Sequence, residues 1–128
     1  MSASCPCGTG REFSDCCRPI LRDERPATTA EQLMRSRYTA YVRRDGPYLL
    51  RTWHPERRPR ALGFDDTEWL GLEVLATEAG GADDATGTVT FTAQFTRPGE
   101  GIETMGEVSE FVRLDGRWVY VDGVQSSG

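Results

Sequence analysis

All four cysteines of this 128-residue chain lie within its first seventeen residues, as Cys5, Cys7, Cys16 and Cys17. So close a cluster indicates a chemical link between the thiols, either disulfides or one shared metal ion. Zn²⁺ accepts four thiolates in a tetrahedral arrangement, and two cysteine pairs joined by a short loop can surround one ion. Disulfides would close very short loops or join the adjacent Cys16 and Cys17, which strains the bridge. We predict one structural Zn²⁺ bound by all four cysteines, with disulfides or free redox thiols as the alternatives.

The loop between the two cysteine pairs contains residues suited to wrapping an ion. Gly8 and Gly10 permit the positive φ angles that a tight turn needs, and Phe13 can shield the sulfurs from water. Arg11 and Arg18 add positive charge beside a zinc centre with four thiolates, which carries excess negative charge. We predict that both arginines contact an acidic protein partner, with an affinity that falls as salt is added.

The charges of the chain are unevenly distributed. Residues 1–60 hold twelve arginines against seven acidic residues, residues 61–128 hold three against thirteen, and lysine is absent. The net charge of −5 argues against broad nucleic-acid binding. No apolar run is long enough to span a membrane, and no apolar leader precedes the cysteines. We therefore expect a cytoplasmic protein, in a compartment that keeps thiols reduced.

A helical pattern follows a connector at residues 18–27, in which prolines are expected to prevent regular structure. Thr28 and Glu31 have the spacing of a capping box, which marks the start of a helix. The apolar face of this helix repeats at helical spacing, through Met34, Tyr38, Tyr41 and Val42. A second, short helix is predicted from Pro47 to Trp53.

From Thr67 onward the apolar residues repeat with a period of two, which is typical of strands with one buried face. Further strands are predicted at residues 88–96, 102–114 and 117–122. A bulge is expected near Ser109 and Glu110, and Asp115-Gly116 is the signal for a two-residue hairpin turn.

Helices first and strands after are typical of an α+β fold. One amphipathic helix cannot cover a flat four-stranded sheet, so we predict a curved antiparallel sheet packed on the N-terminal helices. The predicted units are a zinc knuckle at residues 1–20 and an α+β domain at residues 28–125.

The spacing Cys-x-Cys-Gly-x-Gly-x-x-Phe-x-x-Cys-Cys at residues 5–17 resembles the SEC-C zinc motif, named from the C-terminal tail of the SecA translocation ATPase. The resemblance implies that Cys5, Cys7, Cys16 and Cys17 are the zinc ligands. SEC-C tails are associated with an export chaperone and with ribosomes. A protein partner in protein export or at the ribosome is therefore what the resemblance implies.

Four further stretches resemble the YchJ-like family of small bacterial proteins: residues 36–41, 48–55, 69–72 and 111–118. Members join an N-terminal SEC-C motif to a cone-shaped domain similar to nuclear transport factor 2 and to cystatin. The resemblance runs nearly end to end, and it implies a fold and a metal rather than an enzymatic activity.

His54, the only histidine, is a candidate general acid or base. No second group at a diagnostic spacing accompanies it, so we predict no catalytic residue. Arg37 lies beside the apolar face of the first helix, and we expect it to pair with an acid of the sheet, Glu107 or Glu110. Candidate lining residues of a pocket between helix and sheet are Tyr38, Tyr41, Trp53, His54 and Trp118.

Two functions from different classes follow from these features. The favoured one is a non-enzymatic zinc-binding protein whose knuckle docks to a protein partner. The alternative is a small-molecule-binding or enzymatic domain, with a pocket near His54 and a purely structural zinc. A filled domain would favour the first, and a deep pocket containing an acid and His54 would favour the second.

Overall fold

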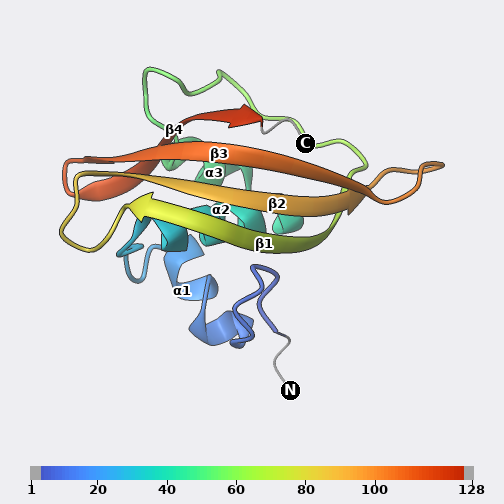
Figure 1. Ribbon diagram of the computed structural model, residues 1–128, viewed down its shortest axis with the longest axis horizontal. Helices are drawn as coiled ribbons and strands as arrows, with labels where there is room; N and C mark the ends of the chain where they lie inside the picture. Colours follow the sequence, from blue (N-terminus) through green and yellow to red (C-terminus); the bar gives the residue numbers. More distant parts are fainter. Residues whose placement is uncertain (1–3, 126–128) are drawn as a thin grey trace.

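Four strands curve over one long helix, α2 (Ala30–Arg43), in the computed structural model, which describes residues 4–125 (Figure 1). Before α2 come a short 3₁₀ turn, η1 (Phe13–Asp15), and helix α1 (Arg18–Leu21), and after it comes α3 (Gly46–Arg51). The strands are β1 (Glu68–Ala79), β2 (Thr86–Thr96), β3 (Glu103–Leu114) and β4 (Arg117–Gln125). No helix within the described range is both long and apolar enough to cross a membrane.

The strands pair in chain order as one antiparallel sheet, β1-β2-β3-β4, which confirms the predicted α+β fold. The register of β3 against β4 shifts between Glu110 and Phe111, where the sequence predicted a bulge. The turn between these strands has φ angles of 53° at Asp115 and 82° at Gly116, as the predicted two-residue turn requires.

Helix α2 begins one residue later than the capping box predicted from the sequence. Thr29 is the N-cap, and its hydroxyl accepts a hydrogen bond from the Gln32 amide at 3.1 Å. The Gln32 side chain in turn accepts from the Thr28 amide at 2.9 Å. Glu31 instead forms an ion pair with Arg35 at 2.9 Å, one helical turn away. Gln32, three residues after Thr29, therefore takes the role in the capping box that the sequence assigned to Glu31.

The predicted connector at residues 18–27 contains a helix, α1, that the sequence analysis missed. Pro19 lies in its first turn, where a missing amide hydrogen costs no helical hydrogen bond. Ile20 and Leu21 are buried beside the cysteines. They therefore anchor the N-terminal segment to the rest of the molecule, as predicted.

Helix α2 separates two apolar clusters. The sheet-side cluster joins the helix to strands β2, β3 and β4 through Ala30, Leu33, Met34, Tyr38, Val89, Phe91, Ala93, Phe111 and Trp118. The knuckle-side cluster contains the four cysteines with Ile20, Leu21, Ala40, Tyr48 and Leu49. In Figure 1 the N-terminal segment lies beside α1, below the edge strand β1 of the sheet.

Candidate functional site

The four cysteine thiols meet in one buried group. Their sulfur atoms all lie within 4.8 Å of one another, and the Cys7 and Cys16 sulfurs are 3.6 Å apart. Sulfurs that bind a tetrahedral Zn²⁺ at about 2.3 Å are separated by about 3.8 Å. All four cysteines are free thiols, with at most 8% of any side chain exposed. The donor set and its spacing fit one Zn²⁺ with four thiolate ligands.

The backbone of the knuckle turns where its glycines allow it. Gly8 has a φ angle of 87° and Gly10 one of 82°, as predicted. The Cys5 amide donates to the Arg11 carbonyl at 2.8 Å, which closes the loop on itself. Phe13 packs against the knuckle-side cluster. A side chain at Gly8 would also approach the Leu72 carbonyl to 3.1 Å, so the loop lies close to β1.

Helix α2 supplies a layer of polar groups around the thiols that the sequence analysis missed. The Thr39 hydroxyl donates to the Cys17 sulfur at 3.4 Å and lies 3.8 Å from the Cys5 sulfur. Arg35 donates to the Cys7 carbonyl at 2.5 Å. These contacts join residues more than twenty positions apart, so no local pattern could have identified them. Groups of this kind orient metal ligands and tune their affinity.

Mutual contact shifts the acidity of the clustered thiols in opposite directions. The pKa of Cys5 is lowered because the Cys17 thiol, and then the Cys7 thiol, hydrogen-bond to its thiolate. The same contact with Cys5 raises the pKa of Cys17. Thiolates this close repel one another, so a divalent cation is needed for all four to be ionised together.

The predicted partner-binding arginines occupy different settings. Arg11 is exposed, and its guanidinium donates to the Asp15 carbonyl at 3.0 Å. Arg25 donates to the same carbonyl at 3.0 Å and to the Cys16 carbonyl at 3.1 Å. Arg18 is half-buried at the start of α1. The structure therefore brings Arg11 together with Arg25, which the sequence analysis had placed in the connector.

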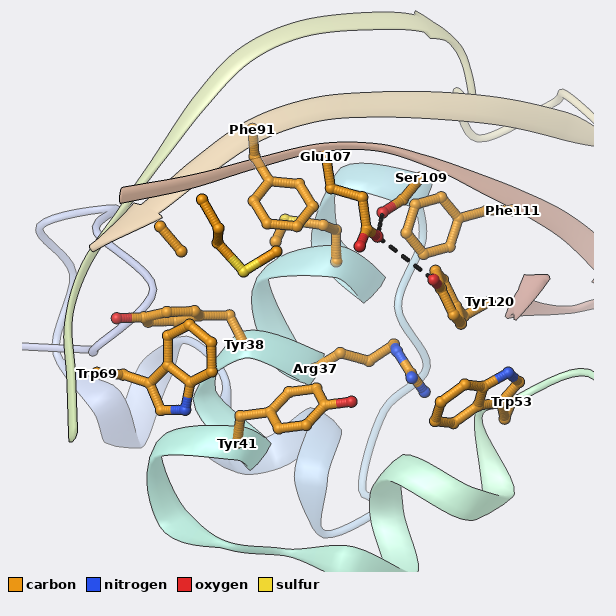
Figure 2. A pocket seen from close by; sticks show the side chains of 13 residues that line it. Arg37, Tyr38, Tyr41, Trp53, Trp69, Phe91, Glu107, Ser109, Phe111 and Tyr120 are labelled. Carbon is orange, nitrogen blue, oxygen red and sulfur yellow. Dashed lines mark hydrogen bonds between the residues drawn. The ribbon is translucent and has the colours of Figure 1, made fainter. Parts of the chain in front are cut away.

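A pocket of about 310 Å³ lies between α2 and the sheet (Figure 2). Aromatic side chains form most of its wall: Tyr38, Tyr41, Trp53, Trp69, Phe91, Phe111 and Tyr120. Three of the five predicted pocket residues, namely Tyr38, Tyr41 and Trp53, are among them. The domain is therefore hollow at this point, and its lining includes the acid Glu107 but not His54, so neither of the two predicted arrangements is met in full.

The structure places His54 and Trp118 outside this lining, which corrects two of the predicted pocket residues. The His54 amide donates to the Tyr120 carbonyl at 2.8 Å, and its ring nitrogen Nδ1 accepts from the Glu56 amide at 3.1 Å. His54 therefore stabilises the turn after α3. Trp118 is buried near the start of α2, where its indole donates to the Thr28 carbonyl at 3.2 Å.

Arg37 extends from α2 to the polar end of the pocket. Only 5% of the residue is exposed. Its Nη1 donates to the Leu49 carbonyl at 2.8 Å and to the Thr52 hydroxyl at 2.7 Å. The guanidinium lies 4.9 Å from the Trp53 ring centre and 4.7 Å from that of Tyr120. Burial lowers the pKa of Arg37, but a guanidinium remains protonated in proteins.

Glu107 lines the same pocket, where its Oε2 accepts from the Ser109 hydroxyl and, at 3.3 Å, from the Tyr120 hydroxyl. Burial, and next the Glu107 charge, raise the pKa of Tyr120. A side chain at Gly123 would collide with the carboxylate and lie 2.8 Å from the Tyr120 hydroxyl, so this arrangement requires glycine. The ion pairs among residues 4–125 do not include Arg37, so the expected pairing with Glu107 or Glu110 was wrong.

Comparison with known proteins gives two family matches that together cover most of the chain. Residues 29–123 match the family of the YchJ middle NTF2-like domain, and residues 1–19 match the SEC-C motif. A UPF0225 protein of Streptomyces avermitilis is 50% identical over 122 residues, which cover 94% of this chain and 84% of that protein. One from Chromobacterium violaceum is 48% identical over 126 residues, 95% of this chain and 93% of the relative.

Two solved structures share the fold. The solution structure of a SEC-C motif containing protein from Rhodopseudomonas palustris superposes with a TM-score of 0.82, at 36% identity, and covers 99% of this chain and 100% of that one. The crystal structure of a SEC-C motif containing protein from Psychrobacter arcticus gives a TM-score of 0.76 at 28% identity, covering 98% and 84% of the two chains. Knuckle and sheet thus occur together in these relatives.

Proposed function

This chain belongs to the YchJ-like family and joins a SEC-C motif to an NTF2-like domain, and on that premise we propose that it is a non-enzymatic zinc-binding protein whose knuckle docks to a protein partner. The observation that carries the proposal is that the knuckle has a buried part and an exposed part. The four thiols point inward and are buried, while the loop between them, residues 8–12, is exposed throughout.

The metal would act on shape rather than on chemistry. Catalytic zinc sites keep a coordination position open for water or substrate, whereas structural sites use four protein ligands. Four buried sulfurs within 4.8 Å of one another support a site of the second kind, with all four coordination positions taken by protein ligands. Zinc would therefore hold the loop of residues 8–12 in one conformation, and a segment this short has no apolar core of its own to do so.

The surface that zinc would hold in place carries paired positive charge. The Arg11 and Arg25 guanidinium groups share the Asp15 carbonyl, beside a shallow hollow that Gly10, Pro19 and the acids Glu12 and Asp15 also line. Two adjacent guanidinium groups favour a carboxylate of a partner, which can bind each of them through two hydrogen bonds. An acidic segment of a cytoplasmic protein is the occupant that we propose. An export chaperone and the ribosome are the first partners to test.

The metal is tested by elemental analysis of the purified, reduced protein. We expect about one Zn²⁺ per chain, as for a closed site with four ligands. A value below half a zinc per chain in metal-replete protein, or a mapped disulfide among the cysteines, would contradict the metal proposal.

Docking is tested by recovery of purified ribosomes and of the purified export chaperone on the immobilised zinc-loaded protein. Arg11→Glu with Arg25→Glu should lower recovery at least tenfold, and salt should lower the recovery by the parent protein. Arg57→Glu with Arg60→Glu is the matched control, because it makes the same charge change in an exposed loop far along the chain. Zinc content and melting temperature should not change in the control, and both are measured for the Arg11 and Arg25 variant because Arg25 also donates to the Cys16 carbonyl.

Two results would overturn the docking proposal. One is that the parent protein recovers neither partner at low salt. The other is that the Arg11 and Arg25 variant recovers as much as the parent at the same salt. The first would leave the zinc result standing, because the metal content is measured separately.

A further inference from the structure

The pocket between α2 and the sheet takes no part in the proposed docking, yet it has the size and walls of a ligand site. Its volume of about 310 Å³ lies at the lower end of the range for small-molecule sites, roughly 300–1,000 Å³. The wall at one end is formed by Tyr38, Tyr41 and Trp69, whose rings pack edge-on or tilted against one another with centres about 6 Å apart. Walls of this kind favour a flat ligand.

Arg37 offers unused hydrogen-bond donors to this space. The hydrogen bonds of its guanidinium to residues of the described chain all come from Nη1. No buried polar side-chain atom of the described residues lacks a partner, and Arg37 lines the pocket, so we place Nη2 and Nε at the open space of the cavity. Figure 2 shows the guanidinium at the edge of the cavity, beside the Trp53 ring. A cation buried to this extent has lost most of its water, which makes an acceptor from a ligand valuable.

Glu107 offers an unused acceptor on the sheet side of the same space. Its Oε2 accepts from Ser109 and Tyr120, while Oε1 has no donor among the described residues. By the same reasoning Oε1 borders open space. In Figure 2 the carboxylate points from β3 into the cavity, toward the side where Arg37 lies.

The two charges together determine the kind of ligand that fits. An anion on Arg37 would be repelled by Glu107, and a cation on Glu107 would be repelled by Arg37. A zwitterion would satisfy both groups but would lose the hydration of two charges, at several kcal/mol per ion. A neutral ring with an adjacent N–H and C=O meets both requirements. Its N–H donates to Glu107, its C=O accepts from Arg37, and its flat faces contact the aromatic wall.

We propose that this pocket binds a small, neutral, planar heterocycle with a cyclic amide edge, as in oxopurines and pteridinones. The ring would lie among the aromatic side chains, with its amide edge toward Arg37 and Glu107. This binding function goes beyond the docking role of the knuckle and does not depend on it.

The proposal is tested on the full-length, zinc-loaded protein by calorimetric titration with four probes. Lumazine and hypoxanthine carry the amide edge, unsubstituted purine has a similar flat shape without it, and phenylalanine is an aromatic zwitterion. We expect dissociation constants in the micromolar range for lumazine or hypoxanthine. Purine and phenylalanine should bind at least tenfold more weakly, since purine offers no carbonyl to Arg37 and phenylalanine loses the hydration of two charges.

Two variants and one control locate the site. Glu107→Gln keeps the shape of the side chain but removes its charge, and should weaken binding of the amide probes at least tenfold. Ala93→Leu adds bulk to a buried position that lines the pocket, removes no side-chain hydrogen bond and should abolish binding. Glu110→Gln is the matched control on the same strand, because Glu110 is exposed and does not line the pocket. Its affinity for the probes should equal that of the parent.

Any of three results would overturn the proposal. The first is that the amide probes do not bind at millimolar concentration. The second is that purine or phenylalanine binds as tightly as they do. The third is that Glu107→Gln leaves the affinity unchanged in a protein with the parent's melting temperature. Recovery of protein partners through Arg11 and Arg25 is a separate measurement. Failure of either proposal therefore leaves the other standing.

Discussion

The two faces of helix α2 contact regions that are built in opposite ways. On one face lies the knuckle, whose four thiols come from thirteen consecutive residues and meet in a filled, buried group. On the other lies the pocket, whose polar end joins Arg37 of α2 to Glu107 of β3 and Tyr120 of β4. The first region is formed by a short local segment whose thiols could hold a metal ion. The second depends on strand pairing over most of the chain.

Packing differs between the two faces as well. Protein interiors are normally packed without voids larger than a water molecule. The thiol group on the knuckle side is closely packed, with every cysteine at most 8% exposed and the Thr39 hydroxyl in contact with the sulfurs of Cys5 and Cys17. The sheet side leaves a pocket of about 310 Å³ beside a buried cation. A filled region stabilises a shape, whereas a hollow one with unused polar groups is suited to binding.

The largest effect should follow removal of the metal or Cys17→Ser. Opening the knuckle exposes Ile20 and Leu21, and each such side chain contributes about 1.5–3 kcal/mol when buried. We therefore expect the Tm to fall by roughly 10 °C or more. Hydrogen exchange should quicken in α1 and in the half of α2 that contacts the cysteines, and much less in β2 and β3. Re-addition of zinc to the chelated protein is the control.

An unchanged Tm on chelation would contradict the expectation that the knuckle stabilises the rest of the molecule. It would show that the knuckle and the domain are independent units, as the predicted division between residues 20 and 28 implies. Residues 1–3 of the predicted knuckle lie outside the described part of the chain.

The next largest effect should come from Arg37→Met on the pocket face. The Leu49 carbonyl and the Thr52 hydroxyl would lose a charged donor, which costs about 1–3 kcal/mol of unfolding free energy. Arg43→Met is the control on the same helix, because its guanidinium lies over the Phe13 ring, 4.5 Å from its centre, and is partly solvated. Urea unfolding measures both. Equal losses would show that burial of Arg37 has no special role.

A smaller effect is expected for Thr39→Val on the knuckle face. The change preserves the shape but removes the hydroxyl that donates to the Cys17 sulfur. We expect about 1 kcal/mol less stability and an affinity for zinc about tenfold lower, measured by competition with a chromogenic chelator. Ser36→Ala is the control, because Ser36 bonds to Leu33 and Tyr48 and not to a thiol. If both variants lose zinc equally, the hydroxyl of Thr39 does not support the site.

The smallest effect is expected where neither region is touched. Leu75 on β1 is 54% exposed and belongs to neither apolar cluster. Leu75→Lys should change the unfolding free energy by less than about 0.5 kcal/mol. It should also leave zinc content and ligand binding as they are in the parent protein. A larger loss in thermal or urea unfolding would reveal a third stabilising region on the outer face of the sheet.

Predictions from the sequence are confirmed where the physical cause is local. Alternation along β2 places Val89, Phe91, Ala93 and Phe95 on the buried face, because successive side chains of a strand point to opposite sides. The turn at residues 115–116 followed from the φ angles that aspartate and glycine tolerate. The cysteine spacing likewise predicted the thiol group, since a short loop limits where its ends can lie.

Predictions from the sequence were wrong where a distant segment provides the hydrogen-bond partner of a side chain. Arg37 was expected to pair with an acid but hydrogen-bonds to Leu49 and Thr52 of the neighbouring helix. His54 was expected near the pocket but is held in a turn by β4. In both cases a backbone carbonyl of another element, Leu49 for Arg37 and Tyr120 for His54, is one of the partners. Its position is determined only when the elements have packed.

Helices α2 and α3, the four strands and the group of four cysteines, but not α1, could be predicted from the sequence alone, because each follows from periodicity, turn chemistry or spacing over a few residues. Only the tertiary structure decided that Thr39 supports the thiols, that Arg11 lies with Arg25, and that Arg37 and Glu107 face one cavity. The physical reason is that hydrogen bonds act over about 3 Å. Which groups come that close depends on strand register and helix packing, and the register shift between Glu110 and Phe111 is a long-range feature of this kind.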